Sequence, residues 1–250
     1  MEYFQKQLDE CAQALKRCRS IAVSTGAGIS KESGIPTFRD AQEGLWANYN
    51  PEELATPQGF QNNPELVWRW YEERRNKIGK AMPNPGHYAI AELEEAFEEF
   101  TLITQNIDNL HRKAGSKNIV EFHGNIFKLK CFDNEHPIEN IPQDDDRIPP
   151  RCHCGSMLRP DVVWFGEVPC EDSFRRAGRA LETCEVLLVV GTSGLVYPAA
   201  AFPSQAKQAG AFVIEVNPEI SAITPLADAF LKGPSGEVLP RLVERYRELV

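Results

Sequence analysis

The stretch that decides the fold is Thr25 to Arg39, which reads TGAGISKESGIPTFR and directly follows the short apolar run 20–24. A strand-forming run that breaks into closely spaced glycines is typical of the point where an α/β sheet enters a phosphate-binding loop, because glycine lets backbone N–H groups approach an anion. The glycines are Gly26 and Gly28, whereas Lys31 stands where the fingerprint G-x-G-x-x-G has its third glycine. The pattern therefore predicts a phosphate-binding loop but not an ordinary nicotinamide dehydrogenase. A plain glycine-rich turn with a core Phe and a surface Arg would read the same, so other segments must decide.

The overall composition narrows the class of protein. A chain of 250 residues suffices for one α/β domain, alone or with a smaller insertion, and 42% hydrophobic and 25% charged residues are ordinary for a soluble protein. The formal net charge of -9 argues against nucleic acid or an anionic membrane as the main partner, since phosphate groups require a basic face. No window reaches the length of a membrane span, and the first residues do not resemble a signal peptide, so we expect a cytoplasmic protein.

The alternation of elements predicts a parallel sheet with both faces covered by helices. Apolar runs predict strands at 20–24, 100–104, 118–122, 162–165, 185–190 and 211–216. Helical spacing predicts helices at 2–19, within 51–80, and at 85–99, 109–114, 171–183, 199–210 and 240–250. Several strands run into polar residues at the edge where open parallel sheets bind ligands, namely Gln105 to Asp108, His123, Gly191 to Ser193 and Asn217 to Glu219.

The seven cysteines do not suggest disulfides, since no export signal precedes them. Four lie in helical-looking segments and are expected to be packing residues: Cys11, Cys18, Cys170 and Cys184. The other three lie in the stretch 130–160, which is rich in Pro, Asp, Cys and His and has little periodicity. We therefore expect a small insertion there that is held together by something other than an apolar core.

The ordered motifs GAGIS, GIPTFR, QNID, FHGN, RPDVVWFGE, GTS and NPE make the chain resemble the sirtuins, which are NAD-consuming protein lysine deacylases, from about Ser20 to its end. The resemblance implies one α/β catalytic domain, 1–250, with a Rossmann-like parallel sheet. It implies a large part at about 1–36, 84–126 and 160–250, and a small part at about 37–83 and 127–159 formed by a helical insertion and a cysteine-containing module.

The chemistry that the resemblance implies begins when an acylated lysine offers its amide oxygen to the anomeric carbon of the nicotinamide ribose of NAD. Nicotinamide leaves, and the acyl group ends on the ribose as O-acyl-ADP-ribose. His123 is the implied general base that deprotonates a ribose hydroxyl, because imidazole titrates in a suitable pH range. The structural alternative is a histidine that merely closes a strand end beside Gly124.

The resemblance also implies the residues that contact NAD. Phe38 would cover the reacting face and Arg39 would lie near the phosphates. Asn106 and Asp108 would bind the nicotinamide carboxamide, which needs one donor and one acceptor. The remaining implied contacts are Gly26, Ala27, Gly28, Ile29, Ser30, Gln105, Ile107, Gly191, Thr192, Ser193, Asn217, Pro218, Glu219 and, in a last loop over the adenine, Ser235.

Two further segments concern the substrate. The family lays its peptide against a strand edge that matches Val163, Trp164, Phe165 and Gly166. Tyr71 and Arg74 share a helix face and match the Tyr-x-x-Arg signature of the desuccinylase and demalonylase branch, in which the arginine fork binds a carboxylate. The implied activity is removal of succinyl and malonyl groups from lysine, with weaker deacetylation. A tyrosine packed on a helix beside a solvated arginine is the plain alternative.

The chain departs from the family in its metal site. Sirtuins usually hold a structural zinc with two C-x-x-C pairs, but Cys131 lacks its second thiol, and Cys152 and Cys154 are one residue too close. These three thiols with His136 or His153 could complete a tetrahedral zinc site, or the module could fold without metal; the sequence leaves both open. Two rival functions also stay open: a protein ADP-ribosyltransferase that uses the same NAD site, and a non-catalytic NAD-binding module.

Overall fold

The computed structural model describes residues 2–36, 51–138 and 147–250. Phe38 and Arg39 therefore lie outside the described residues. Within the described residues, no helix combines the length and apolar composition that crossing a membrane requires.

The main sheet contains six parallel strands in the order β3-β2-β1-β7-β8-β9. The strand order reverses between β1 and β7, so the carboxyl ends of these two strands form the switch point of the sheet, which is where open α/β sheets bind their ligands. The predicted α/β class is confirmed. The strands are β1 (Ser20–Thr25), β2 (Glu99–Thr104), β3 (Ile119–Glu121), β7 (Val186–Val190), β8 (Phe212–Asn217) and β9 (Ala229–Lys232).

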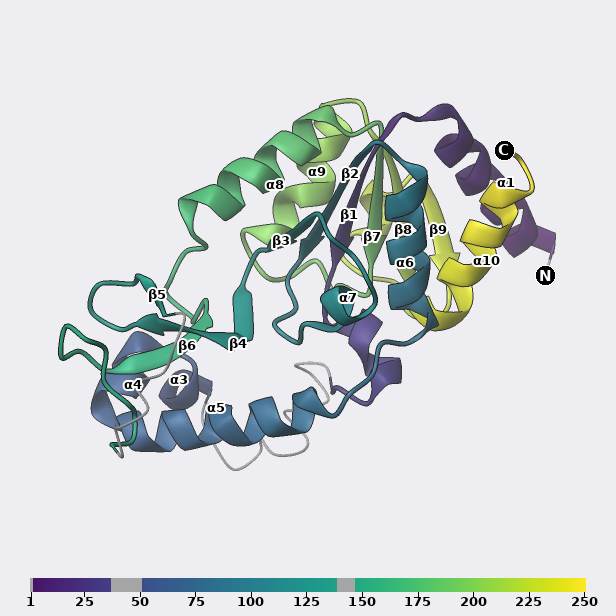
Figure 1. The fold of residues 1–250 in the computed structure, drawn as a ribbon. Coiled ribbons are helices and arrows are strands. Elements are labelled where there is room, and N and C mark those ends of the chain that lie inside the picture. Colours follow the sequence, from purple (N-terminus) through teal and green to yellow (C-terminus); the bar gives the residue numbers. More distant parts are fainter. Residues whose placement is uncertain (1, 37–50, 139–146) are drawn as a thin grey trace.

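Helices cover both faces of this sheet because its strands are apolar on both sides. Along β7, Leu188 packs into the core under α1, α6 and α10, whereas Leu187 packs into the core under α8 and α9. Figure 1 shows these two helical layers on opposite sides of the strands. The helical segments of this part are α1 (Glu2–Arg17), η1 (Ala27–Ser33), α6 (Pro85–Ala96), α7 (Leu110–Lys113), α8 (Glu171–Thr183), η3 (Ala199–Ala201), α9 (Phe202–Gln208), η4 (Thr224–Leu226) and α10 (Ser235–Arg247).

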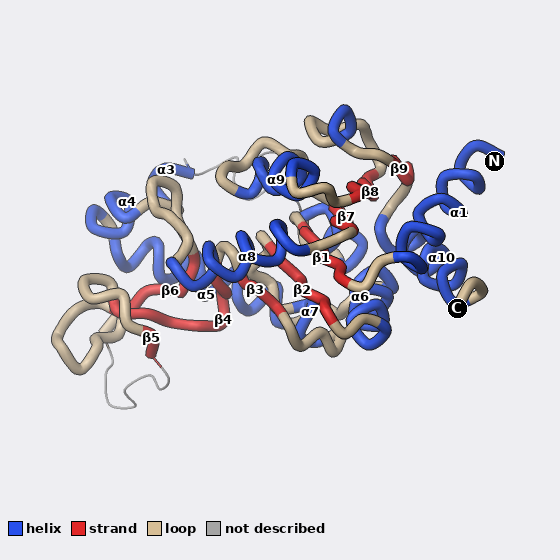
Figure 2. Tube along the Cα trace, turned by 90° about the horizontal axis from the view of Figure 1, so that it is seen from above, coloured by secondary structure: helices blue, strands red, loops and turns tan. Residues whose placement is uncertain are grey.

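A second, antiparallel sheet in the order β5-β4-β6 lies beside the main sheet, as Figure 2 shows. Three helices pack on it around a separate apolar cluster that includes Phe60, Val67 and Trp164. The longest of these helices begins at Pro64, and the side chain of Asn63 caps it by accepting the Leu66 N–H at 3.2 Å. The elements are α3 (Pro51–Leu54), α4 (Pro57–Asn62), α5 (Pro64–Gly79), β4 (Gly124–Cys131), β5 (Pro137–Ile138) and β6 (Leu158–Val162).

The prediction that 162–165 is a strand of the parallel sheet is wrong. β6 ends at Val162 and pairs antiparallel with β4. The following backbone leaves the sheet: the Val163 N–H donates to the His123 carbonyl at 3.0 Å and the Phe165 N–H donates to the Ala55 carbonyl at 2.8 Å. A short apolar run has the same composition in either kind of sheet, so its pattern alone could not decide.

The last helix also differs from the prediction, since α10 begins at Ser235 rather than at Pro240. The carboxylate of Glu32 accepts the Gly236 N–H at 2.7 Å and the Ser235 hydroxyl at 3.2 Å, and so supplies the cap of the helix. Ser235 is consequently a helix residue that is tied to η1, not a residue of a free loop.

The loops that leave β1 and β7 pack directly against each other. The Gly28 N–H donates to the Gly191 carbonyl at 2.8 Å, and the Gly26 N–H donates to the Val190 carbonyl at 3.0 Å. A Cβ on Gly28 would lie 2.7 Å from the Gly191 Cα. These glycines are therefore required by the close approach of two backbones, and their N–H groups are already engaged. This corrects the reason that the sequence suggested for them, which was N–H groups free to bind an anion.

Substitution of Gly28 by Ala tests this contact. The added Cβ would meet backbone atoms, so we expect the free energy of unfolding in urea to fall by about 1–3 kcal/mol. The matched control is Gly178→Ala in α8, where nothing lies within 4 Å of the new Cβ. Because alanine is the better helix former, the control should raise the free energy of unfolding by about 0.5–1 kcal/mol. Equal effects of the two substitutions would contradict the proposed contact.

Candidate functional site

The predicted site residues from different loops gather along the carboxyl edge of the main sheet. The Gln105 N–H donates to the Thr25 carbonyl at 2.9 Å, and the Gln105 side chain donates to the Thr192 hydroxyl at 3.4 Å. The Asn217 amide donates to the Thr192 carbonyl at 2.9 Å. The ends of β1, β2, β7 and β8 are thus joined into one surface. The other predicted NAD contacts lie in the same loops. Ala27 and Ile29 belong to η1. Ile107 follows Asn106, and Ser193 follows Thr192. Pro218 and Glu219 are exposed beyond the end of β8.

A buried polar cluster lies where the β1 and β2 loops meet. The Ser30 hydroxyl donates to Asp108 at 2.6 Å, and the Asn106 amide donates to the Gly26 carbonyl at 3.1 Å and to the Ser30 hydroxyl at 3.2 Å. Both N–H groups of Asn106 are therefore used, so this side chain presents its oxygen as an acceptor. Burial raises the pKa of Asp108, although the Ser30 hydroxyl and the Leu110 N–H oppose the shift.

Two buried histidines behind this cluster were not singled out from the sequence. Their rings are 4.8 Å apart between centroids. His87 accepts the Asn84 N–H at its Nδ1, which leaves the N–H at Nε2, 3.5 Å from the Ser30 hydroxyl. His111 lies 3.0 Å from the Thr25 hydroxyl. Burial lowers the pKa of His87 to about 4 and lowers that of His111 as well, so both are neutral at pH 7. A histidine at an apolar position of a helix was the available signal.

His123 lies in the two-residue turn between β3 and β4, where the chain passes from one sheet to the other. Its Nδ1 is 3.2 Å from the Gln105 carbonyl, and because a carbonyl can only accept, Nδ1 carries the proton of the neutral ring. The lone pair is therefore on Nε2. Burial lowers the pKa of His123, and the hydrogen bond to Gln105 opposes this shift. The arrangement gives a neutral imidazole that can take up a proton at Nε2.

Tyr71 and Arg74 lie on one face of α5, beside the polar cluster. Tyr71 is buried, and its oxygen accepts the indole N–H of Trp164 at 2.9 Å. Arg74 is half-buried, with its guanidinium carbon 5.2 Å from the centroid of the Trp70 ring. Burial lowers the pKa of Arg74, while Tyr71 and Asp108 oppose the shift through their charge interactions with it. The structure thus brings this pair next to Asp108, on the opposite side of the site from the sheet.

The segment Val163 to Gly166 differs from a simple strand edge. The Val163 and Phe165 N–H groups donate to backbone carbonyls, as described above, and the Trp164 N–H donates to the Glu167 carboxylate at 2.8 Å. These three donors are consequently engaged within the protein rather than open to a peptide strand. The Phe165 side chain is 50% exposed, so the segment does present an apolar surface to solvent.

Three thiols converge at the end of β4. The sulfur atoms of Cys131, Cys152 and Cys154 lie within 4.8 Å of one another, and those of Cys131 and Cys154 are 3.5 Å apart. Sulfur atoms of a tetrahedral zinc site are about 3.8 Å apart, given a Zn–S distance of about 2.3 Å. His136 Nε2 is 3.2 Å and His153 Nδ1 is 3.5 Å from the Cys152 sulfur. The donor set fits zinc, which the three thiolates and one of these imidazoles would hold as a structural ion.

We expect the purified protein to contain about one zinc ion per chain by atomic absorption, and its removal by a chelator to lower the Tm. Cys154→Ser should reproduce both losses, because it removes one ligand. The matched control is Cys170→Ser, since Cys170 is an exposed cysteine outside the cluster. A metal-free protein whose Tm does not respond to chelator would show that the module folds without metal.

A switch point in a parallel sheet, a buried polar cluster and a neutral imidazole define a nucleotide-binding α/β protein equipped for acid–base chemistry. The sequence model of the Sir2 family matches residues 26–198. The chain therefore belongs to the Sir2 family, and the predicted membership of the sirtuins is confirmed.

Relatives are similar over nearly the whole chain. An NAD-dependent protein deacylase of Pyrococcus abyssi is 52% identical over 249 residues, which cover 96% of this chain and 98% of the relative. A solved Sir2 homologue in complex with NAD is 44% identical with a TM-score of 0.87, covering 96% of this chain and 94% of the other. A Sir2 structure bound to a myristoylated histone peptide is 36% identical with a TM-score of 0.76, covering 98% of each chain.

Proposed function

We propose that this chain is an NAD-dependent protein-lysine deacylase that acts preferentially on succinyl and malonyl groups and more weakly on acetyl groups. The names of the relatives support the general activity. The observation that carries the preference is the pairing of Tyr71 with a half-buried Arg74 beside Asp108.

NAD supplies an electrophilic anomeric carbon and a leaving group whose amide has two N–H donors. The oxygens of Asn106 and Asp108 suit these donors, because both N–H groups of Asn106 are committed elsewhere. Burial of Ser30 and Asp108 keeps water from the same pocket, which protects an activated glycosyl carbon from hydrolysis. These residues thus position the leaving group and exclude the competing nucleophile.

His123 is the proposed base. Its Nε2 takes the proton of a ribose hydroxyl, and the resulting oxygen bonds to the carbon of the former lysine amide. The carbon–nitrogen bond then breaks, the lysine amine leaves with a proton, and one water completes the conversion to O-acyl-ADP-ribose. The Gln105 carbonyl holds the ring in the tautomer that this step requires.

The acyl preference depends on the charge at the end of the acyl chain. Succinyl and malonyl groups end in a carboxylate, and the guanidinium fork binds a carboxylate through two charge-assisted hydrogen bonds. Low solvent exposure strengthens such a pair. An apolar chain along the same wall offers no charge that could pair with the Arg74 cation, so we expect myristoyl-lysine to be a poor substrate.

The reaction products decide between the functions. A deacylase leaves unlabelled protein, free nicotinamide and O-acyl-ADP-ribose when it is given NAD and an acylated peptide. A protein ADP-ribosyltransferase would instead leave labelled ADP-ribose on protein, and a binding module would release no nicotinamide.

Replacement of Arg74 by Met tests the acyl preference. Because hydrogen bonds to charged groups contribute about 1.5–3 kcal/mol, we expect the ratio of kcat/KM for succinyl-lysine to kcat/KM for acetyl-lysine to fall about 10–100-fold. Arg69→Met is the matched control, since Arg69 lies on the same helix but pairs with Glu65 in solvent. Equal losses on both substrates would mean that Arg74 is merely structural.

Replacement of His123 by Ala should lower kcat/KM about 10²–10⁴-fold. In the unsubstituted enzyme, only the neutral ring acts as a base, so activity is lost as the pH falls through the His123 pKa. Burial places that pKa below the ordinary value of 6.5, and the acid limb of the kcat/KM profile should therefore lie below pH 6.5. An acid limb above that value, or an active alanine variant, would exclude this assignment.

A further inference from the structure

The hydrogen bond between Trp164 and Tyr71 constrains the direction of the tyrosine hydroxyl. An indole N–H can only donate, so the Tyr71 oxygen is the acceptor in this 2.9 Å contact. The tyrosine must then direct its own proton elsewhere. Both side chains are 2% exposed, and among the described residues Tyr71 donates no hydrogen bond. A buried hydroxyl in this state is set to donate to a group that a ligand brings.

Trp164 is itself held from two sides. The Arg159 guanidinium lies over its ring, with the guanidinium carbon 3.3 Å from the ring centroid, and Arg159 is 1% exposed. Glu167 binds Arg159 with both carboxylate oxygens, one of them at 2.9 Å, and also accepts the Trp164 N–H of the backbone. Arg159 further donates to the Val162 carbonyl at 2.7 Å. The ring and the backbone of Trp164 are thus fixed together.

The clamp on Trp164, formed by Arg159 and Glu167, is held together by charge. Burial alone would raise the pKa of Glu167, but the hydrogen bond and charge of Arg159 hold it below its ordinary value. The clamp therefore remains an ion pair at neutral pH. A buried ion pair fixes geometry more than it adds stability, which suits a role in positioning.

We propose that Trp164 determines acyl specificity by orienting the Tyr71 hydroxyl as a donor to the terminal carboxylate of the acyl chain. The inference rests on the proposed function, since it names a second residue behind the same preference. Trp164 acts through Tyr71 and is a positioning residue. Donation by the indole also polarises the phenol, which strengthens the hydrogen bond that the phenol donates in turn. An acetyl group has no terminal carboxylate and cannot use this donor.

The test removes the indole N–H and keeps an aromatic side chain, although a smaller one. In Trp164→Phe we expect the ratio of succinyl-lysine to acetyl-lysine kcat/KM to fall about tenfold, with the loss mainly in KM for the succinyl peptide. Tyr71→Phe should lower the ratio to a similar extent. In the Trp164→Phe background, Tyr71→Phe should lower it by less than about threefold, because the two residues act as one unit.

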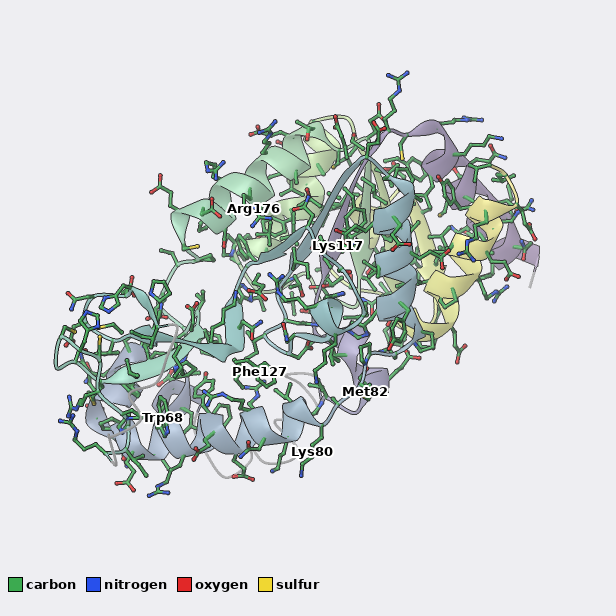
Figure 3. The ribbon with its side chains drawn as sticks, in the orientation of Figure 1. Trp68, Lys80, Met82, Lys117, Phe127 and Arg176 are labelled. Atoms are coloured by element: carbon green, nitrogen blue, oxygen red, sulfur yellow. The ribbon has the colours of Figure 1, made fainter. Side chains whose placement is uncertain are left out.

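The matched control is Trp68→Phe. Trp68, labelled in Figure 3, lies on the same helix as Tyr71. It is 6% exposed and packs in the cluster that includes Cys131 and Leu158. Its substitution should leave the ratio unchanged. If Trp164→Phe does not fold, incorporation of benzothienylalanine at position 164 replaces the N–H by sulfur in a ring of nearly the same shape, and should lower the ratio in the same way.

The outcomes separate this inference from the proposed function. An unchanged ratio in either position-164 variant, together with a reduced ratio in Tyr71→Phe, would overturn the role of Trp164 and leave the proposed function standing. A full additional loss from Tyr71→Phe in the Trp164→Phe background would overturn it as well. An unsubstituted enzyme that does not prefer succinyl or malonyl peptides over acetyl peptides would contradict the proposed function itself.

Discussion

The structure depends on the contact between the two loops that leave neighbouring strands at the switch point. The Gly28 N–H to Gly191 carbonyl bond, at 2.8 Å, leaves no space for a side chain between the two backbones. Because β1 and β7 are held this closely, the carboxyl ends of β2 and β8, which pair with them, lie beside this contact at the same edge of the sheet. The hydrogen bonds of Gln105 and Asn217 to Thr192 depend on that alignment.

The small sheet supplies the other half of the site, and His123 is where the two parts meet. The chain passes through this residue from β3 into β4, and its carbonyl accepts the Val163 N–H just beyond β6. Burial shifts three ionisable groups of the predicted site and its surroundings, Asp108, His87 and His123, toward their neutral forms.

The sequence was sufficient to predict the features of the fold that depend on residues close together in the chain. The strand before Thr25 and the alternation of strands and helices follow from apolar periodicity, and the family follows from short motifs. Features set by distant residues could not be predicted. The start of α10 depends on Glu32, which precedes Ser235 by 203 positions. The apolar run 162–165 reads as a parallel strand until β4 is placed beside β6, which ends at Val162. The buried role of His87 appears only once Ser30 lies next to it.

The central claim is that one cleft binds the nucleotide through the sheet edge and the acyl carboxylate through α5. Its most direct test is a crystal structure of the protein with a succinyl-lysine peptide and an unreactive NAD analogue. The account predicts that the succinyl carboxylate lies within hydrogen-bond distance of the Tyr71 hydroxyl and the Arg74 guanidinium, with His123 Nε2 facing the ribose. A carboxylate that points into solvent, or an imidazole that turns away from the ribose, would contradict it.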